Sequence, residues 1–166
     1  QALTTTSEYD TMDLMESLEA KNLVTIDQSS FGTTRYRLLE SVRIYASDQL
    51  VRSDEAGRTQ DAYAEYYCHL TTTSDFAVAG GINRALRLRE DWPNIAATLE
   101  YFITESEFET AAGMAFGCQG MWESQLPATE GRRWTEALID QLPPGPQRDW
   151  MVYALTMFCI VLDDWI

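Results

Sequence analysis

The chain has few of the residues that most reaction centres need. Its 166 residues include one lysine, Lys21, and one histidine, His69. A phosphate-binding P-loop needs a glycine-rich turn with lysine before Ser or Thr, whereas Lys21 lies in LEAKNLV. A zinc site or a catalytic triad needs partner residues, and none is found at a suitable spacing from His69. We therefore expect this segment to hold no cofactor and to carry no catalytic residues of its own.

Positive charge and long apolar runs are also scarce. Lys and Arg number 12 against 26 Asp and Glu, which gives a net charge of −14. Such a surface repels the phosphates of nucleic acids and anionic lipids. The longest apolar stretch, MVYALTMFCIVL, has about 12 residues, whereas a membrane-spanning helix needs roughly 18. We expect neither direct nucleic-acid binding nor membrane binding.

Cysteine is limited to Cys68, Cys118 and Cys159, each among apolar residues and without C-x-x-C spacing. An odd number of widely separated cysteines favours free, buried thiols in a reducing compartment. The pattern therefore predicts a cytoplasmic protein.

The first 58 residues predict a helix, a β-hairpin and a second helix. Residues 7–22 have acidic side chains in the first turn and Asn22 as a left-handed C-cap. LVTID and TRYRL read as strands around the turn QSSFGT. A helical stripe follows and ends at Gly57; its members are Leu39, Val42, Ala46 and Leu50. This order predicts the C-terminal part of a winged-helix-like module in residues 1–58.

Residues 59–166 predict helices throughout, joined by short loops. Tyr63, Tyr66, Tyr67 and Leu70 mark one apolar face, and Pro93 suits the first turn of a later helix. Further inward positions are Trp134, Ala137, Leu138 and Leu142. In residues 107–124, Gly113, Gly117 and Gly120 suggest close approach by another helix, because mid-helix glycine is otherwise unfavourable. The fold class expected is mainly α, with a small winged-helix-like hairpin element followed by antiparallel, tetratricopeptide-like helical hairpins that begin a longer array.

A candidate interaction surface consists of five arginines and one tryptophan: Arg35, Arg37, Arg43, Arg132, Arg133 and Trp122. Glu40 precedes Arg43 by three residues, and Glu130 and Glu136 flank the second pair of arginines, so these charges can instead neutralise one another. Trp122 can line a ligand pocket or pack between helices, and aromatic residues at helical spacing usually pack.

A different class of function is indicated by Asp163 and Asp164 in IVLDDWI. Paired carboxylates at a helix end hold magnesium against diphosphate in some all-α enzymes. The alternative hypothesis is therefore a fragment of an all-α, magnesium-dependent enzyme, and the competing interpretation is two solvated acids at the end of an apolar helix.

Three stretches together resemble a known family. They are RYRLLESVRIYASDQL, REDWPNIAATLEYFI with Asn94 and Ala97, and MWESQLPATEGRRWTEALI with Trp122, Glu130, Gly131, Arg132, Arg133 and Trp134. Their order and spacing resemble the LuxR/AfsR-type signal-transduction ATPases, transcriptional regulators common in actinobacteria. The likeness covers about residues 10 to 143.

The resemblance implies a modular protein with a P-loop ATPase, a winged-helix module, tetratricopeptide-like repeats and a separate DNA-binding helix-turn-helix. ATP and magnesium would be bound elsewhere in that protein. This chain, which opens with Gln1 and not Met, would be the middle piece. The expected function is a sensor and interaction segment whose partners are other domains of the same chain and a protein or small-molecule effector.

Overall fold

The computed structural model describes residues 8–29, 32–73 and 81–162. These residues form two compact units, one ending at Tyr63 and the other beginning at Ala64. The division falls inside one helix, α3 (Ala56–Thr72), which also contains the sequence-based boundary after residue 58. The mainly α fold with one small antiparallel hairpin agrees with the fold class expected from sequence.

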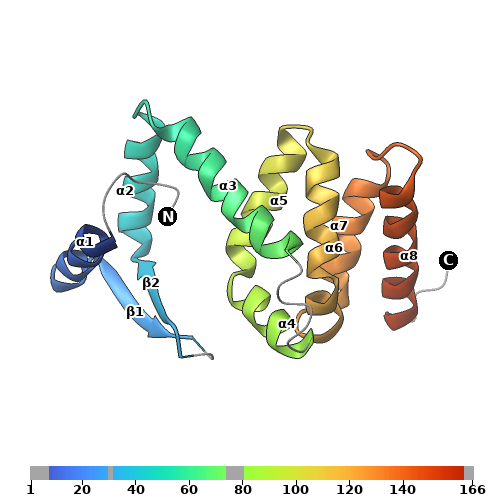
Figure 1. Ribbon diagram of the computed structural model, residues 1–166, viewed down its shortest axis with the longest axis horizontal. Helices are drawn as coiled ribbons and strands as arrows, with labels where there is room; N and C mark the ends of the chain where they lie inside the picture. The colour runs from blue at the N-terminus through green and yellow to red at the C-terminus, as the bar shows by residue number, and fades with distance from the viewer. Residues whose placement is uncertain (1–7, 30–31, 74–80, 163–166) are drawn as a thin grey trace. The chain divides into compact units, whose positions relative to one another are not determined.

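The first unit has the predicted order of helix, hairpin and helix (Figure 1). Its elements are α1 (Glu8–Ala20), β1 (Val24–Gln28), β2 (Thr34–Leu38) and α2 (Glu40–Val51), followed by the first part of α3. Asn22 has a φ of 55°, and its N–H donates to the carbonyl of Glu19 at 2.8 Å. The N–H of Leu23 donates to the carbonyl of Leu18 at 3.0 Å. This pair of bonds is a Schellman motif, so the predicted left-handed C-cap is confirmed.

The predicted helix stop at Gly57 is wrong. α2 ends at Val51, and Gly57 lies in the first turn of α3. Ser53 explains the earlier end, because its N–H and its hydroxyl both donate to the carbonyl of Leu50, at 2.9 and 2.7 Å. Side-chain bonds of serine to nearby backbone compete with helix continuation.

The described residues of the second unit form the rest of α3 and five further helices (Figure 1). They are α4 (Gly81–Glu90), α5 (Trp92–Thr104), α6 (Phe108–Ser124), α7 (Ala128–Ile139) and α8 (Pro146–Val161). Pro93 lies in the first turn of α5, as predicted. α6 packs against α4, α5, α7 and α8, so it is the central helix of this unit.

An aromatic cluster forms the centre of the second unit. Trp92 contacts Trp122 and Trp134 edge to face, with ring centroids 5.6 and 6.2 Å apart. Phe158 of α8 meets Trp122 at 6.2 Å. A Cβ atom on Gly131 would lie 2.5 Å from the Phe158 ring, so this glycine allows α7 and α8 to approach closely. Aromatic pairs of this geometry stabilise beyond the area they bury.

One of the three predicted glycine spacers makes a close helix contact. A Cβ atom on Gly117 would lie 1.9 Å from the carbonyl oxygen of Thr71, which places α3 directly against α6. A Cβ on Gly113 would meet a methyl group at an ordinary 3.8 Å, and one on Gly120 would meet nothing within 4 Å. The prediction of close approach therefore holds for Gly117 and is wrong for the other two.

The end of α3 is held by the side chain of Arg84. Its guanidinium donates to the backbone carbonyls of Thr71 and Thr73 and, at 3.4 Å, to that of Gly117. Carbonyls at a helix C-terminus lack partners within the helix, so a cation there satisfies them and opposes the helix dipole. Arg84 thus connects α4 to the junction of α3 and α6.

Two inward positions were predicted wrongly from helical spacing. Tyr66 is 59% exposed, because the buried face of α3 runs through Ala64, Tyr67 and Thr71. Ala137 is exposed on α7. The apolar spacing of α3 indicated a face that includes Tyr66. The buried face is instead rotated by about one position, because it includes the polar residue Thr71, which an apolar pattern does not reveal.

Candidate functional site

Two arginines of the predicted surface in the first unit, Arg37 and Arg43, are paired with acidic residues. The side chain of Arg37 on β2 lies 3.6 Å from the carboxylate of Asp27 on β1. Arg43 on α2 donates twice to the Glu40 carboxylate, at 3.0 and 2.6 Å. Arg35 is half-buried on the same strand as Arg37. The pairing of Glu40 with Arg43, which the sequence offered as the alternative to an open interaction surface, is present.

The bidentate pair changes the acidity of both partners. The hydrogen bond from Arg43 holds the pKa of Glu40 below its ordinary value, and the hydrogen bond to Glu40 raises the pKa of Arg43. Both side chains are well exposed, at 61% and 69% for Arg43 and Glu40. Water screens such pairs, so this one fixes a local geometry and adds little to stability.

On α7, Arg132 and Arg133 diverge to different partners. Arg132 donates to Glu136 at 2.7 Å, and its side chain is 27% exposed. Arg133 lies 3.7 Å from Glu130, and its guanidinium carbon is 4.9 Å from the centroid of the Trp134 ring. Arg133 is the more exposed of the two, at 62%. It is therefore the member of the predicted surface that the second unit presents best to a partner.

Trp122 does not belong to an exposed surface. Its exposed fraction is 1%, and it lies within the aromatic cluster, so its place in the predicted interaction surface is corrected to core packing. Within the described part of the chain, the indole N–H groups of Trp122 and Trp134 have no hydrogen-bond partner. Buried indole N–H groups usually find a partner, so these two are exceptions within the aromatic cluster.

The groups considered for chemistry are dispersed. Cys118 is fully buried, and burial raises the pKa of its thiol to about 12; burial also raises the pKa of Cys68. His69 is exposed on α3. Among residues 8–29, 32–73 and 81–162 no three His, Cys, Asp or Glu side chains gather in a way that holds a metal ion. Asp163 and Asp164 lie outside the described residues.

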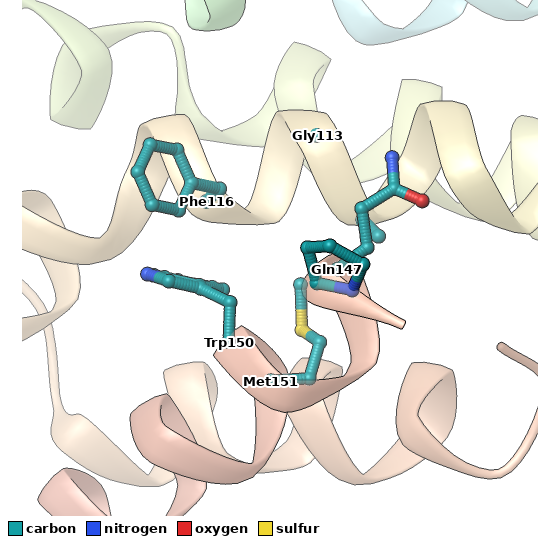
Figure 2. Close-up of a pocket in the computed structure, with 7 residues that line it drawn as sticks. Gly113, Phe116, Gln147, Trp150 and Met151 are labelled. Carbon is teal, nitrogen blue, oxygen red and sulfur yellow. The ribbon is translucent and has the colours of Figure 1, made fainter. Parts of the chain in front are cut away.

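A hollow lies between α6 and α8 in the second unit, with a volume of about 320 Å³ (Figure 2). Its lining comes from two short stretches, Ala112, Gly113 and Phe116 on α6 and Pro146, Gln147, Trp150 and Met151 on α8. The rings of Phe116 and Trp150 meet at 4.3 Å between centroids with planes inclined at 70°. Phe116 is 55% exposed, so the aromatic pair forms an accessible wall.

Sequence reasoning missed this hollow. The signal was present as small residues, Ala112 and Gly113, next to an aromatic residue one turn later on the same helix. Recognising it required knowing that the first turn of α8 lies opposite this part of α6, which no local pattern gives. Trp150 was also outside every stretch that resembled a known family.

Comparison with known proteins gives relatives among regulators. The chain is 29% identical over 135 residues to proteins named "Putative HTH-type transcriptional regulator" in Mycobacterium tuberculosis and in Mycobacterium bovis. The match covers 80% of this chain and 15% of each relative, so the chain spans a small part of their length. No family model and no solved structure matches the chain. None of the described helices is long and apolar enough to cross a membrane.

Proposed function

We propose that this chain is a sensor and interaction segment of a multidomain, ATP-dependent bacterial transcriptional regulator. The observation that carries the proposal is the match over 80% of the chain to proteins named as HTH-type transcriptional regulators. The chain covers 15% of those relatives, which leaves room for separate DNA-binding and ATPase modules in a protein of that kind. The resemblance to LuxR/AfsR-type ATPases supplies the finer description.

The second unit suits an interaction role. Its helices pack successively, with α6 against α7 and α7 against α8, around a shared aromatic core. Stacked helical hairpins offer extended surfaces on which partners bind. An effector or partner bound there would favour one of two arrangements of the regulator. This shift requires that the effector or partner binds one arrangement more tightly than the other.

Nucleic acid and nucleotide are assigned to other modules of the proposed regulator. A net charge of −14 opposes the phosphate contacts that dominate DNA affinity. In this chain the single lysine lacks the glycine-rich setting that a P-loop lysine requires. The segment therefore acts by binding partners and not by reading DNA or hydrolysing ATP, and it belongs in the cytoplasm with the DNA.

The first test uses the chain of residues 1–166 itself. Calorimetric titrations with ATP and magnesium, and with a DNA duplex, are expected to show no binding at micromolar concentrations. Saturable binding of either ligand in that range would overturn the assignment, because the proposed segment carries neither activity.

The second test uses the longest reading frame that contains this chain. Arg133→Glu reverses an exposed charge on α7, and Arg58→Glu is its matched control, since both arginines lie three residues after a glutamate partner. We expect Arg133→Glu to alter ATP hydrolysis or promoter response while the affinity for DNA is retained. Equal behaviour of the two variants and the parent in both readouts would contradict a role for the repeat surface.

A further inference from the structure

We propose that the hollow between α6 and α8 binds an uncharged, flat, mostly apolar small molecule that inserts beside Phe116 and Trp150. The inference deepens the proposed function, on which it rests, because it names the effector class and its site. Neither the match to regulators nor the resemblance to a family points to these residues.

The size of the hollow suits a small molecule. A volume of about 320 Å³ lies at the lower end of the roughly 300–1,000 Å³ range of ligand pockets. A folded partner or an amphipathic helix would need a long groove, whereas this lining comes from one turn of α6 and one turn of α8. A compact ligand is the occupant that the dimensions favour.

The shape of the wall favours a flat ligand. Ala112 and Gly113 leave one side of the hollow nearly without side chains, while Phe116 and Trp150 form an aromatic edge at one end (Figure 2). Aromatic groups prefer offset or edge-to-face contact with other rings. A ring system placed over the small residues would meet the Phe116–Trp150 pair in that manner.

The charge of the site favours a neutral ligand. All seven lining residues are uncharged, so an anion or a cation bound here would lack a partner. The net charge of −14 further disfavours an anion. Gln147 brings a carboxamide with both donor and acceptor groups to the end of the hollow away from Phe116 and Trp150 (Figure 2). One hydrogen-bonding edge on the ligand would match it.

Gly113 gives a way to close the hollow without disturbing the core. A Cβ atom there would make only ordinary contact, 3.8 Å from a methyl group of Thr72, so a side chain is tolerated at this position. Gly120 lies on the same helix, outside the hollow, and has nothing within 4 Å of a Cβ atom. Leucine at either position raises helix propensity equally, but only leucine at position 113 would fill the site.

The experiment is a fluorescence titration of the chain with N-phenylnaphthylamine, a neutral aromatic probe whose emission rises in apolar surroundings. We expect one saturable site in the parent chain. The sulfonated analogue, anilinonaphthalene sulfonate, has a similar ring system with an added charge and is expected to bind about tenfold more weakly or worse. Equal affinity for the two probes would overturn the assignment of a neutral ligand.

Two substitutions locate the binding. Gly113→Leu is expected to weaken the neutral probe by about tenfold or more, while Gly120→Leu retains the parent affinity. Phe116→Ala removes the exposed aromatic wall that the ligand would contact, and it is a second variant expected to weaken probe binding while the core stays intact. Circular dichroism melts confirm that each variant is folded. Binding that survives both Gly113→Leu and Phe116→Ala would place the probe elsewhere and overturn the site.

The two proposals fail separately. If the neutral probe does not bind the parent chain, the hollow is not a ligand site, and the regulatory assignment still rests on the Arg133→Glu comparison. In the second case, Arg133→Glu and its control behave alike, while the probe binds the parent chain and Gly113→Leu abolishes that binding. The ligand site in the hollow is then supported, and the proposed surface on α7 is contradicted.

Discussion

The two units of this chain are stabilised in different ways. Among the described residues of the first unit, Val24 is the one apolar side chain that is fully buried, and α2 buries none. The second unit buries apolar side chains on every helix, including Trp122, Leu99 and Phe158, each at 1% exposure or less. The second unit therefore has its own core, whereas the described residues of the first unit bury little apolar surface among themselves.

Both units leave large apolar side chains exposed. Tyr45 and Val51 on α2 are 66% and 74% exposed, and Leu39 and Ile44 are also exposed. On α8 of the second unit, Tyr153 and Val161 are likewise 57% and 59% exposed, so exposed apolar side chains do not distinguish the units as burial does. Burial, and not apolar composition, therefore separates the two units.

The largest expected change in stability comes from removing one aromatic side chain from the second unit, with a matched removal in the first unit. Trp122→Ala is expected to lower the free energy of unfolding by about 3–5 kcal/mol, because it deletes a fully buried indole and leaves a cavity. Tyr45→Ala, its exposed counterpart, is expected to change it by about 0.5 kcal/mol or less. Urea denaturation followed by circular dichroism measures both. Equal losses would show that the two units do not differ in their cores.

A glycine in each unit sharpens the contrast. Gly117→Ala places a methyl group where the carbonyl oxygen of Thr71 lies, and we expect a loss at the upper end of about 1–3 kcal/mol. Gly57→Ala meets nothing within 4 Å and is expected to stabilise the chain by roughly 0.4–1 kcal/mol. The measurement is the same urea titration. A stabilising Gly117→Ala would show that α3 and α6 can separate at little cost.

One arginine in each unit tests whether a part-buried guanidinium contributes more to stability than an exposed one. Arg84→Met removes a guanidinium that donates to three backbone carbonyls, and we expect a loss of about 1.5–3 kcal/mol. Arg43→Met removes an exposed ion pair with Glu40 and is expected to leave the thermal midpoint unchanged. The measurement is the thermal midpoint of both variants and the parent chain at low and at high salt. A large, salt-sensitive effect of Arg43→Met would contradict the description of the first unit.

Much of the fold was predictable from local signals. Asn22 and Pro93 mark a helix end and a helix start through backbone chemistry that needs no tertiary partner, and both predictions are confirmed. Gly57 misled because glycine in the first turn of a helix looks like glycine after the end of one. The true stop at Ser53 works through a side-chain bond to Leu50, which sequence shows only as a possibility.

The candidate site was less predictable because it depends on which helices meet. Arg43 and Glu40 are neighbours on one helix, so their pairing followed from spacing. Trp122 was open to two interpretations, and the packing of Trp92 and Phe158 around it decides for the core. The hollow at Gly113 and Trp150 joins residues from separate helices, and no single helical pattern contains that information.

An effect of pH again distinguishes the units, since all three cysteines lie after residue 63. Burial raises the pKa of Cys118 from 9.0 to about 12 in the folded chain. Below pH 9 the thiol is protonated in both states and contributes nothing. Between about pH 9 and pH 12 the thiol of the unfolded state releases its proton first, so the free energy of unfolding falls as pH rises, by roughly 1 kcal/mol per pH unit.

The free energies of unfolding from urea titrations at about pH 8 and about pH 10.5 should therefore differ less in Cys118→Ala than in the parent chain. A parent and a variant with the same pH slope would mean that the Cys118 thiolate is accommodated in the folded core.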